Sequence, residues 1–379
     1  MSKLTELLEG VEVEWKSLEE IAIFSNGKGH EKEIVTEGKY VVVNSKFVST
    51  GGKVIKYSNN QICPLFIDDI LIVMSDLPNG KALAKTFLVD QNDRYTLNQR
   101  IGGITIKNKT TLYPKFLNYY LNRSQQLRKY DNGIDQTNLQ KQQILDVNIP
   151  ILPIKVQKEI VRILDTFTEL EAELAAELQK RRMQYKYYST LLFDNVSKSD
   201  LHSIEEVCQV KKGATPIQKA TPGEYPMVVT TSERKSCETY QFDAKAVCIP
   251  LVSSRGHGVA SLNQVYYQEG KFALGNILCA IIPKNENKVC SKYLYYYFQR
   301  TKDYTLVPLM KGGANVALRT NDIEKIKVPI PSLEEQKRIV RILDKFDTLT
   351  TSMSEGLPKE IALRKKQYEY YRDRLLTFK

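Results

Sequence analysis

The amino-acid sequence predicts an α/β protein of the mixed, α+β type. Its expected architecture is two similar mixed α/β modules related by pseudo-two-fold symmetry and separated by two long antiparallel helices that form a coiled coil. Three observations carry this prediction. The chain of 379 residues repeats itself once, each repeat contains β-branched runs of strand length, and each repeat ends in a long segment with apolar residues at heptad spacing.

The repeat is clearest in two nine-residue blocks. Residues 157–165 and 336–344 match at eight of nine positions, with a constant offset of 179. Three other pairs of segments recur in the same order: 17–21 with 203–207, 113–120 with 290–297, and 184–188 with 367–371. Between these landmarks the copies share few residues. Two related modules that read different targets would show this pattern, and so would neutral drift after a duplication.

The repeat divides the chain into four segments. Residues 1–153 and 196–331 are the two expected modules, and residues 154–195 are the first long helix. Residues 332–379 form the second long helix, which should be kinked near Pro358 because proline breaks a helix. Inside the modules, the expected strands are 40–43, 69–74, 101–106, 227–230 and 277–282, and the expected short helices are 115–123 and 292–300.

Both long segments carry an apolar seam with steps of three and four residues. The two seams are Ile160, Ile163, Phe167, Leu170 and Leu174, and Ile339, Ile342, Phe346, Leu349 and Met353. A single seam usually lies on its own domain, whereas two equal seams are most simply buried against each other, as in a coiled coil.

Charge and composition limit the function. Lys and Arg exceed Asp and Glu by 55 − 44 = 11, which favours a polyanionic partner, with nucleic acid first and an acidic membrane face second. No apolar run approaches 18 residues, so no membrane span is expected. The first ten residues lack an apolar signal core, and the six cysteines form no C-x-x-C pair, so the sequence favours a cytoplasmic protein without structural zinc or disulfides.

The sequence offers no catalytic motif. The Asp/Asn-Pro-Pro-aromatic loop of an amino-methyltransferase does not occur, and neither does the G-x-x-x-x-G-K-[ST] loop that cradles phosphates. Asp68 with Asp69 is better explained as a turn than as a metal site, and His257 has no nucleophile motif beside it. We therefore expect no cofactor and no metal in this chain.

Taken together, these residues resemble the specificity subunit of a type I restriction-modification system. The resemblance spans essentially the whole chain, and it rests on the proline-then-glutamine entry into each long helix and on the Gln-Tyr-x-Tyr-Tyr segments at 184–188 and 367–371. The Thr-Glu-Leu and Ala-Glu-Leu units between residues 168 and 178, and the segment 356–358, look like features of the IC subfamily.

The resemblance implies two target recognition domains, each reading one half of a split, asymmetric site on double-stranded DNA. The two helices would set the unread gap and dock two methyltransferase subunits, and motor-nuclease subunits would then join. S-adenosylmethionine is expected in the methyltransferase partner. The four-residue units would act as a ruler, although good helix formers on a surface would give the same pattern.

Polar, glycine-bearing loops in the variable stretches are the expected DNA contacts. Arg100 and Arg255 are the best candidates for reading bases, because a guanidinium can pair with guanine through two hydrogen bonds. The full set is Asn44, Ser45, Lys46, Lys53, Asn79, Lys81, Gln99, Arg100, Thr230, Thr231, Ser232, Arg234, Lys235, Arg255, His257, Lys311, Asn315 and Arg319. Each of these residues could equally lie in a loop that only water contacts.

Two other functions fit parts of the sequence. A structural adaptor would use the paired helices to hold two protein-binding modules, and it would have little affinity for DNA. A fused nuclease-methyltransferase is a second alternative, which the missing motifs oppose.

Overall fold

The computed structural model describes residues 8–78, 80–196, 200–256, 258–352 and 354–378. The chain forms two compact units. Unit 1 contains residues 1–172 and 363–379, and unit 2 contains residues 173–362. Each unit therefore combines one module with parts of both long helical segments.

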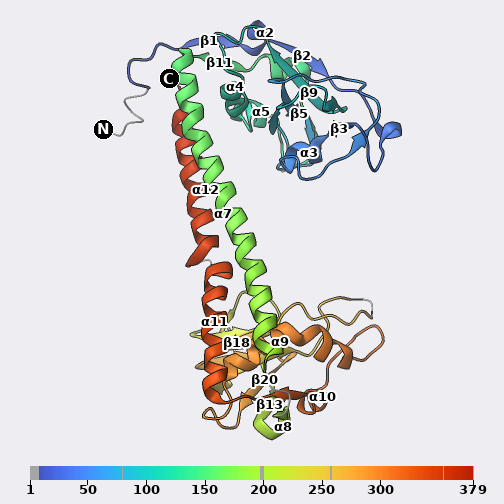
Figure 1. Cartoon of the computed structure of the whole chain (residues 1–379), viewed down its shortest axis with the longest axis vertical. Coiled ribbons are helices and arrows are strands. Elements are labelled where there is room, and N and C mark those ends of the chain that lie inside the picture. Colours follow the sequence, from blue (N-terminus) through green and yellow to red (C-terminus); the bar gives the residue numbers. More distant parts are fainter. Residues whose placement is uncertain (1–7, 79, 197–199, 257, 353, 379) are drawn as a thin grey trace. The chain divides into compact units, whose positions relative to one another are not determined.

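The module of unit 1 is built on two small sheets (Figure 1). The first is antiparallel, in the order β2 (Ala22–Asn26), β9 (Ile101–Ile106), β5 (Ile70–Val73) and β7 (Thr86–Leu88). The second has the order β4 (Tyr57–Ser58), β3 (Tyr40–Val43) and β8 (Tyr95–Leu97), with β3 and β8 parallel. Two further strand pairs are β1 (Glu14–Ser17) with β11 (Asn148–Ile151) and β6 (Ser75–Asp76) with β10 (Thr137–Asn138). The short helices are α2 (Leu18–Ile21), which joins β1 to β2, α3 (Ser45–Ser49), α4 (Pro114–Leu121), α5 (Gln125–Arg128) and α6 (Lys141–Leu145).

The module of unit 2 repeats this plan. Its antiparallel sheet has the order β13 (Cys208–Lys212), β20 (Leu278–Pro283), β17 (Ala246–Pro250) and β18 (Tyr266–Gln268). Its second sheet has the order β15 (Lys235–Cys237), β14 (Tyr225–Val228), β19 (Lys271–Leu274) and β16 (Phe242–Asp243), and β14 and β19 are again parallel. Strand β12 (Leu201–Ser203) pairs with β21 (Lys327–Pro329), and the helices are α8 (Ile204–Val207), α9 (Ser291–Thr305) and α10 (Thr320–Glu324). The duplication expected from the sequence is therefore also a duplication of topology.

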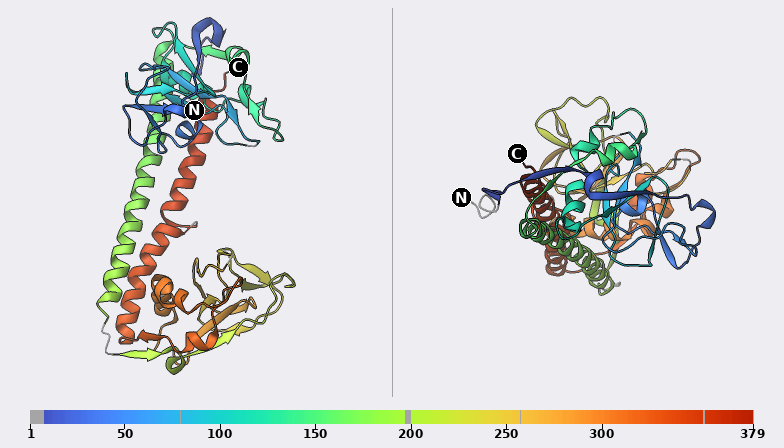
Figure 2. Two further views of the ribbon diagram at one scale, coloured as in Figure 1. Left: turned by 90° about the vertical axis from the view of Figure 1, so that its right-hand side faces the viewer. Right: turned by 90° about the horizontal axis from the view of Figure 1, so that it is seen from above.

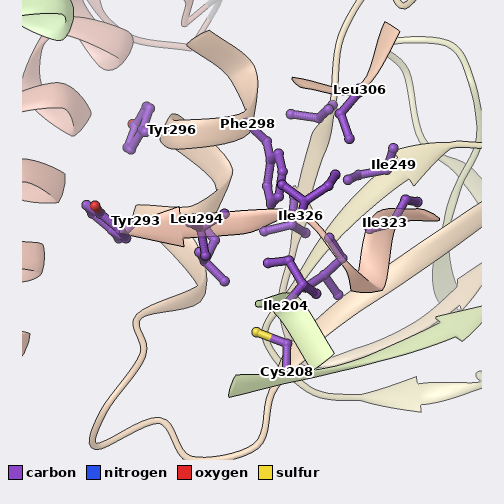
Figure 3. Close-up of a cluster of buried hydrophobic side chains, with 14 of the residues drawn as sticks. Ile204, Cys208, Ile249, Tyr293, Leu294, Tyr296, Phe298, Leu306, Ile323 and Ile326 are labelled. Atoms are coloured by element: carbon purple, nitrogen blue, oxygen red, sulfur yellow. The ribbon is translucent and has the colours of Figure 1, made fainter. Parts of the chain in front are cut away.

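Each module has its own apolar core, which also receives residues from the long helices. In unit 2 the core joins α8, β17, α9 and α10, as Ile204, Ile249, Leu294, Phe298 and Ile323 show in Figure 3. Helix α9 runs five residues beyond the expected end at residue 300, because its buried side chains continue to Thr301.

The first long segment is one helix, α7 (Ile154–Asp194), and the second is interrupted. Helix α11 (Leu333–Thr351) is followed by α12 (Gly356–Leu375), so that Pro358 lies in the first turn of α12, where its missing N–H leaves no helical bond unmade. Gly356 adopts a φ of 76°, in the left-handed region that glycine enters without strain.

Within each unit, α7 pairs antiparallel with the second segment (Figure 1, Figure 2). In unit 1, Phe167 stacks on Tyr371 of α12 with ring centroids 5.0 Å apart. In unit 2, Tyr188 stacks on Phe346 of α11 at 5.6 Å. At these positions each apolar seam meets the tyrosine-rich end of the other segment, whereas the sequence suggested that the two seams face each other.

Two side-chain clusters fasten each module to its helix, and they are the same in both units. Gln157, fully buried, accepts a hydrogen bond from the Tyr113 N–H and donates to the carbonyls of Thr111 and Leu152. Gln336 makes the equivalent three bonds, to the Cys290 N–H and to the carbonyls of Lys288 and Pro331.

The second cluster is a carboxylate that bridges a lysine and a tyrosine. Asp165 lies 2.7 Å from Lys115 Nζ and accepts from the Tyr119 hydroxyl at 2.7 Å. Asp344 does the same with Lys292 at 2.9 Å and Tyr296 at 2.6 Å. Burial raises the pKa of both tyrosines well above its usual range, so each hydroxyl stays a donor.

Among the described residues, no helix is both long enough and apolar enough to cross a membrane.

Candidate nucleic-acid interface

In unit 1, backbone hydrogen bonds gather four variable segments at one edge of the module. The Asn98 N–H donates to Val43 O at 3.2 Å, which joins the turn between β8 and β9 to the start of α3. The Met74 N–H donates to Arg100 O at 3.0 Å, and the Leu139 N–H donates to Met74 O at 2.7 Å. These bonds join the segments 44–53, 74–78 with 80–84, 98–100 and 131–140 where they leave or enter the sheets.

Unit 2 builds the same edge with equivalent bonds. The Gly275 N–H donates to Val228 O at 3.0 Å, the Leu251 N–H to Ile277 O at 2.8 Å, and the Leu318 N–H to Leu251 O at 2.8 Å. The segments 229–235, 251–256 with 258–264, 275–277 and 311–319 are thereby joined in the same way. A repeated edge built from variable loops is the best candidate for a surface that reads DNA, because loops on a fixed scaffold can change without loss of the fold.

Most of the predicted contacts of unit 1 lie on this edge. Lys46 is exposed on α3, and Lys53 follows the turn at Gly51 and Gly52, both of which have a positive φ. Ser45 begins α3, and the side chain of Asn44 is the N-cap of that helix, accepting from the Phe47 N–H at 2.9 Å. Lys81 is exposed in the 77–83 loop.

Gln99 and Arg100 occupy the turn between β8 and β9. The Gln99 amide bonds to Glu31, and Arg100 is exposed with a φ of 68°, an uncommon conformation for a residue with a side chain. Arg100 is therefore open to a ligand at this turn.

In unit 2, the predicted residues Thr230, Thr231, Ser232, Arg234 and Lys235 follow β14, as Asn44 to Lys46 follow β3. All five are exposed, but Arg234 is already engaged with neighbours on β18. Its guanidinium donates to Gln268 Oε1 at 3.0 Å and lies 5.2 Å from the ring centre of Tyr266. Arg234 is therefore held in place, whereas Arg255 lies exposed in the loop after β17.

The last predicted group lies in a hairpin and at the start of a helix. The backbone of Lys311 exchanges two hydrogen bonds of 2.9 Å with Ala317, so Asn315 lies within the hairpin tip. Arg319 is exposed at the N-cap position of α10. Two predicted contacts, Asn79 and His257, lie outside the described residues.

A hollow of about 210 Å³ beside Arg100 is lined by further polar residues. Its lining includes Asn26 at the end of β2, Ser75 on β6 and Asn138 on β10. In sequence these residues are far apart: the pairing of β6 with β10 joins Ser75 to Asn138, and the pairing of β2 with β9 brings Asn26 to the same edge. A carboxamide and a hydroxyl beside an arginine are groups that hydrogen-bond to base edges.

Unit 2 has a hollow of about 240 Å³ at its own loop edge, lined partly by Thr230, Ser253, Asn263 and Gln264. The two hollows are not equivalent, since one opens beside the β8–β9 turn and the other beside the loop after β14. The two modules thus share their backbone arrangement, while the polar side chains at their loop edges differ.

The ionisable groups give no sign of a reaction centre. Burial raises the pKa of the Cys208 and Cys279 thiols to about 12, which keeps both protonated at neutral pH, and a protonated thiol is a poor nucleophile. Within the described residues, no group of three or more His, Cys, Asp or Glu side chains is arranged to hold a metal ion.

The comparisons with known proteins agree with this architecture. Residues 10–180 and 197–363 both match a family described as the type I restriction modification DNA specificity domain. Over 100% of the chain and 97% of the relative, the sequence is 31% identical to the EcoR124I/EcoR124II specificity subunit of a type I restriction enzyme from Escherichia coli. A putative type I restriction enzyme specificity subunit of Haemophilus influenzae is also 31% identical, over 99% of this chain and 98% of that one.

Solved structures share the fold. The S subunit of a type I restriction-modification system from M. genitalium superposes with a TM-score of 0.60, at 19% identity, over the full length of both chains. A chain from a study of the assembly of the type I R-M system gives a TM-score of 0.59, at 18% identity, covering 96% of this chain and 97% of that one.

Proposed function

This chain belongs to the family of type I restriction-modification DNA specificity subunits, and we propose that it reads a split, asymmetric site on double-stranded DNA, one half-site with each module. It performs no catalysis itself and directs a methylation and restriction complex to its target. The observation that carries this proposal is the loop edge built twice by the same backbone bonds and furnished with different side chains. A DNA-binding protein of this kind works in the cytoplasm.

In this proposal, lysines and arginines of the two edges contact phosphates, and polar side chains contact bases. The net charge of +11 supports the phosphate contacts, whose affinity falls as salt rises. Arg100 with Asn138 in unit 1, and Arg255 in unit 2, are the residues we assign to base edges.

We assign the long helices to partner binding and to the spacing of the half-sites. Tyr187 of α7 and Tyr370 of α12 occupy equivalent positions of the repeat and are 63% and 55% exposed. Each forms an edge-to-face pair with the next tyrosine, with ring centroids 5.5 Å apart in one pair and 5.4 Å in the other. Two equal aromatic sites fit two equal methyltransferase subunits, because exposed tyrosines are typical anchors of protein interfaces.

The methyltransferase partner would supply S-adenosylmethionine, and motor-nuclease subunits would complete the complex. Replacing Tyr187 and Tyr370 by alanine tests the docking sites. Each single variant should retain one methyltransferase subunit by native mass spectrometry, and the double variant none. Tyr304→Ala, which removes another exposed tyrosine outside the repeated pair, should retain two. Full retention by the double variant would contradict this assignment.

The four-residue units of α7 are proposed as a ruler, as in the IC subfamily. Removing Ala175 to Leu178 shortens a helix by about 6 Å, or roughly two base pairs of DNA. The gap between the half-sites should shrink, and an unchanged gap in the methylome would contradict the ruler.

The whole proposal is tested by methylome sequencing of cells that carry this chain and its methyltransferase. We expect one methylated motif with two specific halves at a fixed spacing. A continuous motif, or no methylation, would contradict it and would favour the adaptor.

A further inference from the structure

In each module, a polar side chain lies at the start of the loop that follows the equivalent strand, β5 or β17. Asp76 follows β5 and pairs with Thr137, and Ser253 follows β17 and donates its N–H to Val316 O at 3.0 Å. The sheet registers align Ile70 with Val247, since these residues pair with Ile104 and Ile281 in equivalent strands. Asp76 and Ser253 each lie six residues further on, so they occupy one structural position despite their different chemistry.

In unit 1, the Asp76 carboxylate closes the loop that carries Lys81. One oxygen accepts from the Leu77 N–H at 2.9 Å, and the other accepts from the N–H groups of Ala82 at 2.6 Å and Leu83 at 3.1 Å. The loop therefore folds around the carboxylate. A Cβ atom at Gly80 would lie 2.1 Å from a carboxylate oxygen, so the loop has no room for a side chain there.

In unit 2, the Ser253 hydroxyl closes the loop that carries Arg255. Its Oγ donates to Val259 O at 2.5 Å and accepts from the N–H groups of Arg255 and Ser261, both at 3.2 Å. A hydroxyl can donate one hydrogen bond and accept two, so its capacity is fully used. An aspartate and a serine thus perform the same task, and each bonds to backbone groups on both sides of its loop.

Resting on the proposed function, we infer that Asp76 and Ser253 are positioning residues that determine base discrimination in their own half-site. Neither needs to touch a base. Each fixes the path of the loop from which Lys81 or Arg255 reaches the DNA, and a displacement of about 1 Å is enough to spoil a paired hydrogen bond to a base. Discrimination between bases by each module would then depend on a side chain whose hydrogen bonds go to the backbone of its own loop.

The test uses the complete complex of this chain with its methyltransferase subunits. Methylation rates are measured on the recognised site and on sites with one mismatch in either half. Asp76→Ala should lower the ratio of matched to mismatched rates about tenfold for mismatches in one half only. Ser253→Ala should do the same for the other half only, so each variant is the control for the other.

Asp76→Asn separates positioning from a general loss of stability. The asparagine keeps one carboxamide oxygen that can accept from Ala82 and Leu83 but loses the acceptor of the Leu77 N–H, so discrimination should be partly restored relative to Asp76→Ala. If Asp76→Ala does not assemble, Asp76→Asn should still lower discrimination severalfold in one half, and Ser253→Ala is measured as above.

The outcomes separate this inference from the proposed function. A parent complex that ignores mismatches in one of the halves would contradict the proposed function itself. If the parent discriminates in both halves but the variants keep both ratios, or lose discrimination equally in both halves, the positioning inference is overturned and the proposed function stands.

Discussion

The two modules agree in the bonds that fix them to the long helices and differ in the loops at their opposite strand ends. Gln157 and Gln336 make the same three hydrogen bonds, and Asp165 and Asp344 the same pair of contacts. The loops after β5 and β17 are closed by an aspartate in one module and a serine in the other. The hydrogen bonds of these glutamines and aspartates to the rest of the module are therefore repeated, whereas at the loops only the position of the closing residue is repeated.

A second pair of residues departs from this division, because the residue is repeated and its contacts are not. Arg123 in unit 1 donates to the carbonyls of Gly80 and Leu83, both at 3.2 Å, and so clamps the loop from the side. In the repeat its place is taken by Arg300, which pairs with Asp194 of α7 at 2.8 Å. An arginine at one position of the repeat thus supports the loop that carries Lys81 in unit 1 and contacts the long helix α7 in unit 2.

The largest expected effect is on the shared frame. Gln157→Leu should lower the free energy of unfolding by at least about 3 kcal/mol, because three buried backbone groups lose their partner. Gln336→Leu should cost the same within about 1 kcal/mol, since its bonds are the same. Urea unfolding measures both, and Gln179→Leu, at an exposed position of α7, should stay within about 0.5 kcal/mol of the parent. Clearly unequal losses would show that the frames are not equivalent.

The next effect concerns Arg100, whose counterpart by sheet register in unit 2 is Ile277. Arg100→Lys keeps the charge but loses the two-pronged geometry, so it should weaken discrimination at one base pair by about 1–3 kcal/mol, and Arg100→Ala should do the same. Methylation rates on single-mismatch sites measure the loss, and mismatches in the other half serve as the control. If the lysine variant discriminates like the parent, Arg100 contacts a phosphate and not a base.

A smaller effect is expected from lysines that contact phosphate. Lys53→Ala in unit 1 and Lys235→Ala in unit 2 should each weaken DNA binding for all sequences alike and reduce the slope of log affinity against log salt by roughly one. Lys245→Ala is the control, because Lys245 precedes β17 at the strand end opposite the loop edge and pairs with Glu286. A slope unchanged by Lys53→Ala or Lys235→Ala would remove that lysine from the interface.

The smallest effect is on the capping residues that precede β2 and β13. Hydrogen bonds from Ser17 lower the pKa of Glu20, and those from Ser203 lower the pKa of Glu206. A lowered carboxyl pKa stabilises the fold above the unfolded value and loses that effect as pH falls through the folded value. Glu20→Gln and Glu206→Gln should therefore lower the Tm slightly at pH 7 and not near pH 3. A difference that persists in acid would point to lost packing in place of lost charge.

Much of the frame could be predicted from the sequence because its signals are local. The heptad spacing, the entry glutamines and Pro358 indicate where α7, α11 and α12 begin and end. The seam at Phe167 and Phe346 was harder to interpret, because antiparallel pairing brings each seam to a tyrosine-rich segment 158 or 204 residues away in the chain.

The candidate site was predictable only as a set of loops. Lys81 and Arg255 stood out as polar residues beside glycines, and the fold places them in equivalent loops. Asn26 and Ser75 were missed because strand pairing and backbone hydrogen bonds bring them beside Arg100 from distant parts of the chain. The equivalence of Asp76 and Ser253 was hidden because different residues fill one position, and no sequence pattern relates an acceptor of three bonds to a hydroxyl.

The central claim is that each module reads its own half-site independently. It is tested most directly by replacing residues 1–153 with the first module of a related specificity subunit and sequencing the methylome. The account predicts that one half of the motif changes, while the other half and the gap stay as in the parent. A motif that keeps both halves, or changes in both, would contradict it.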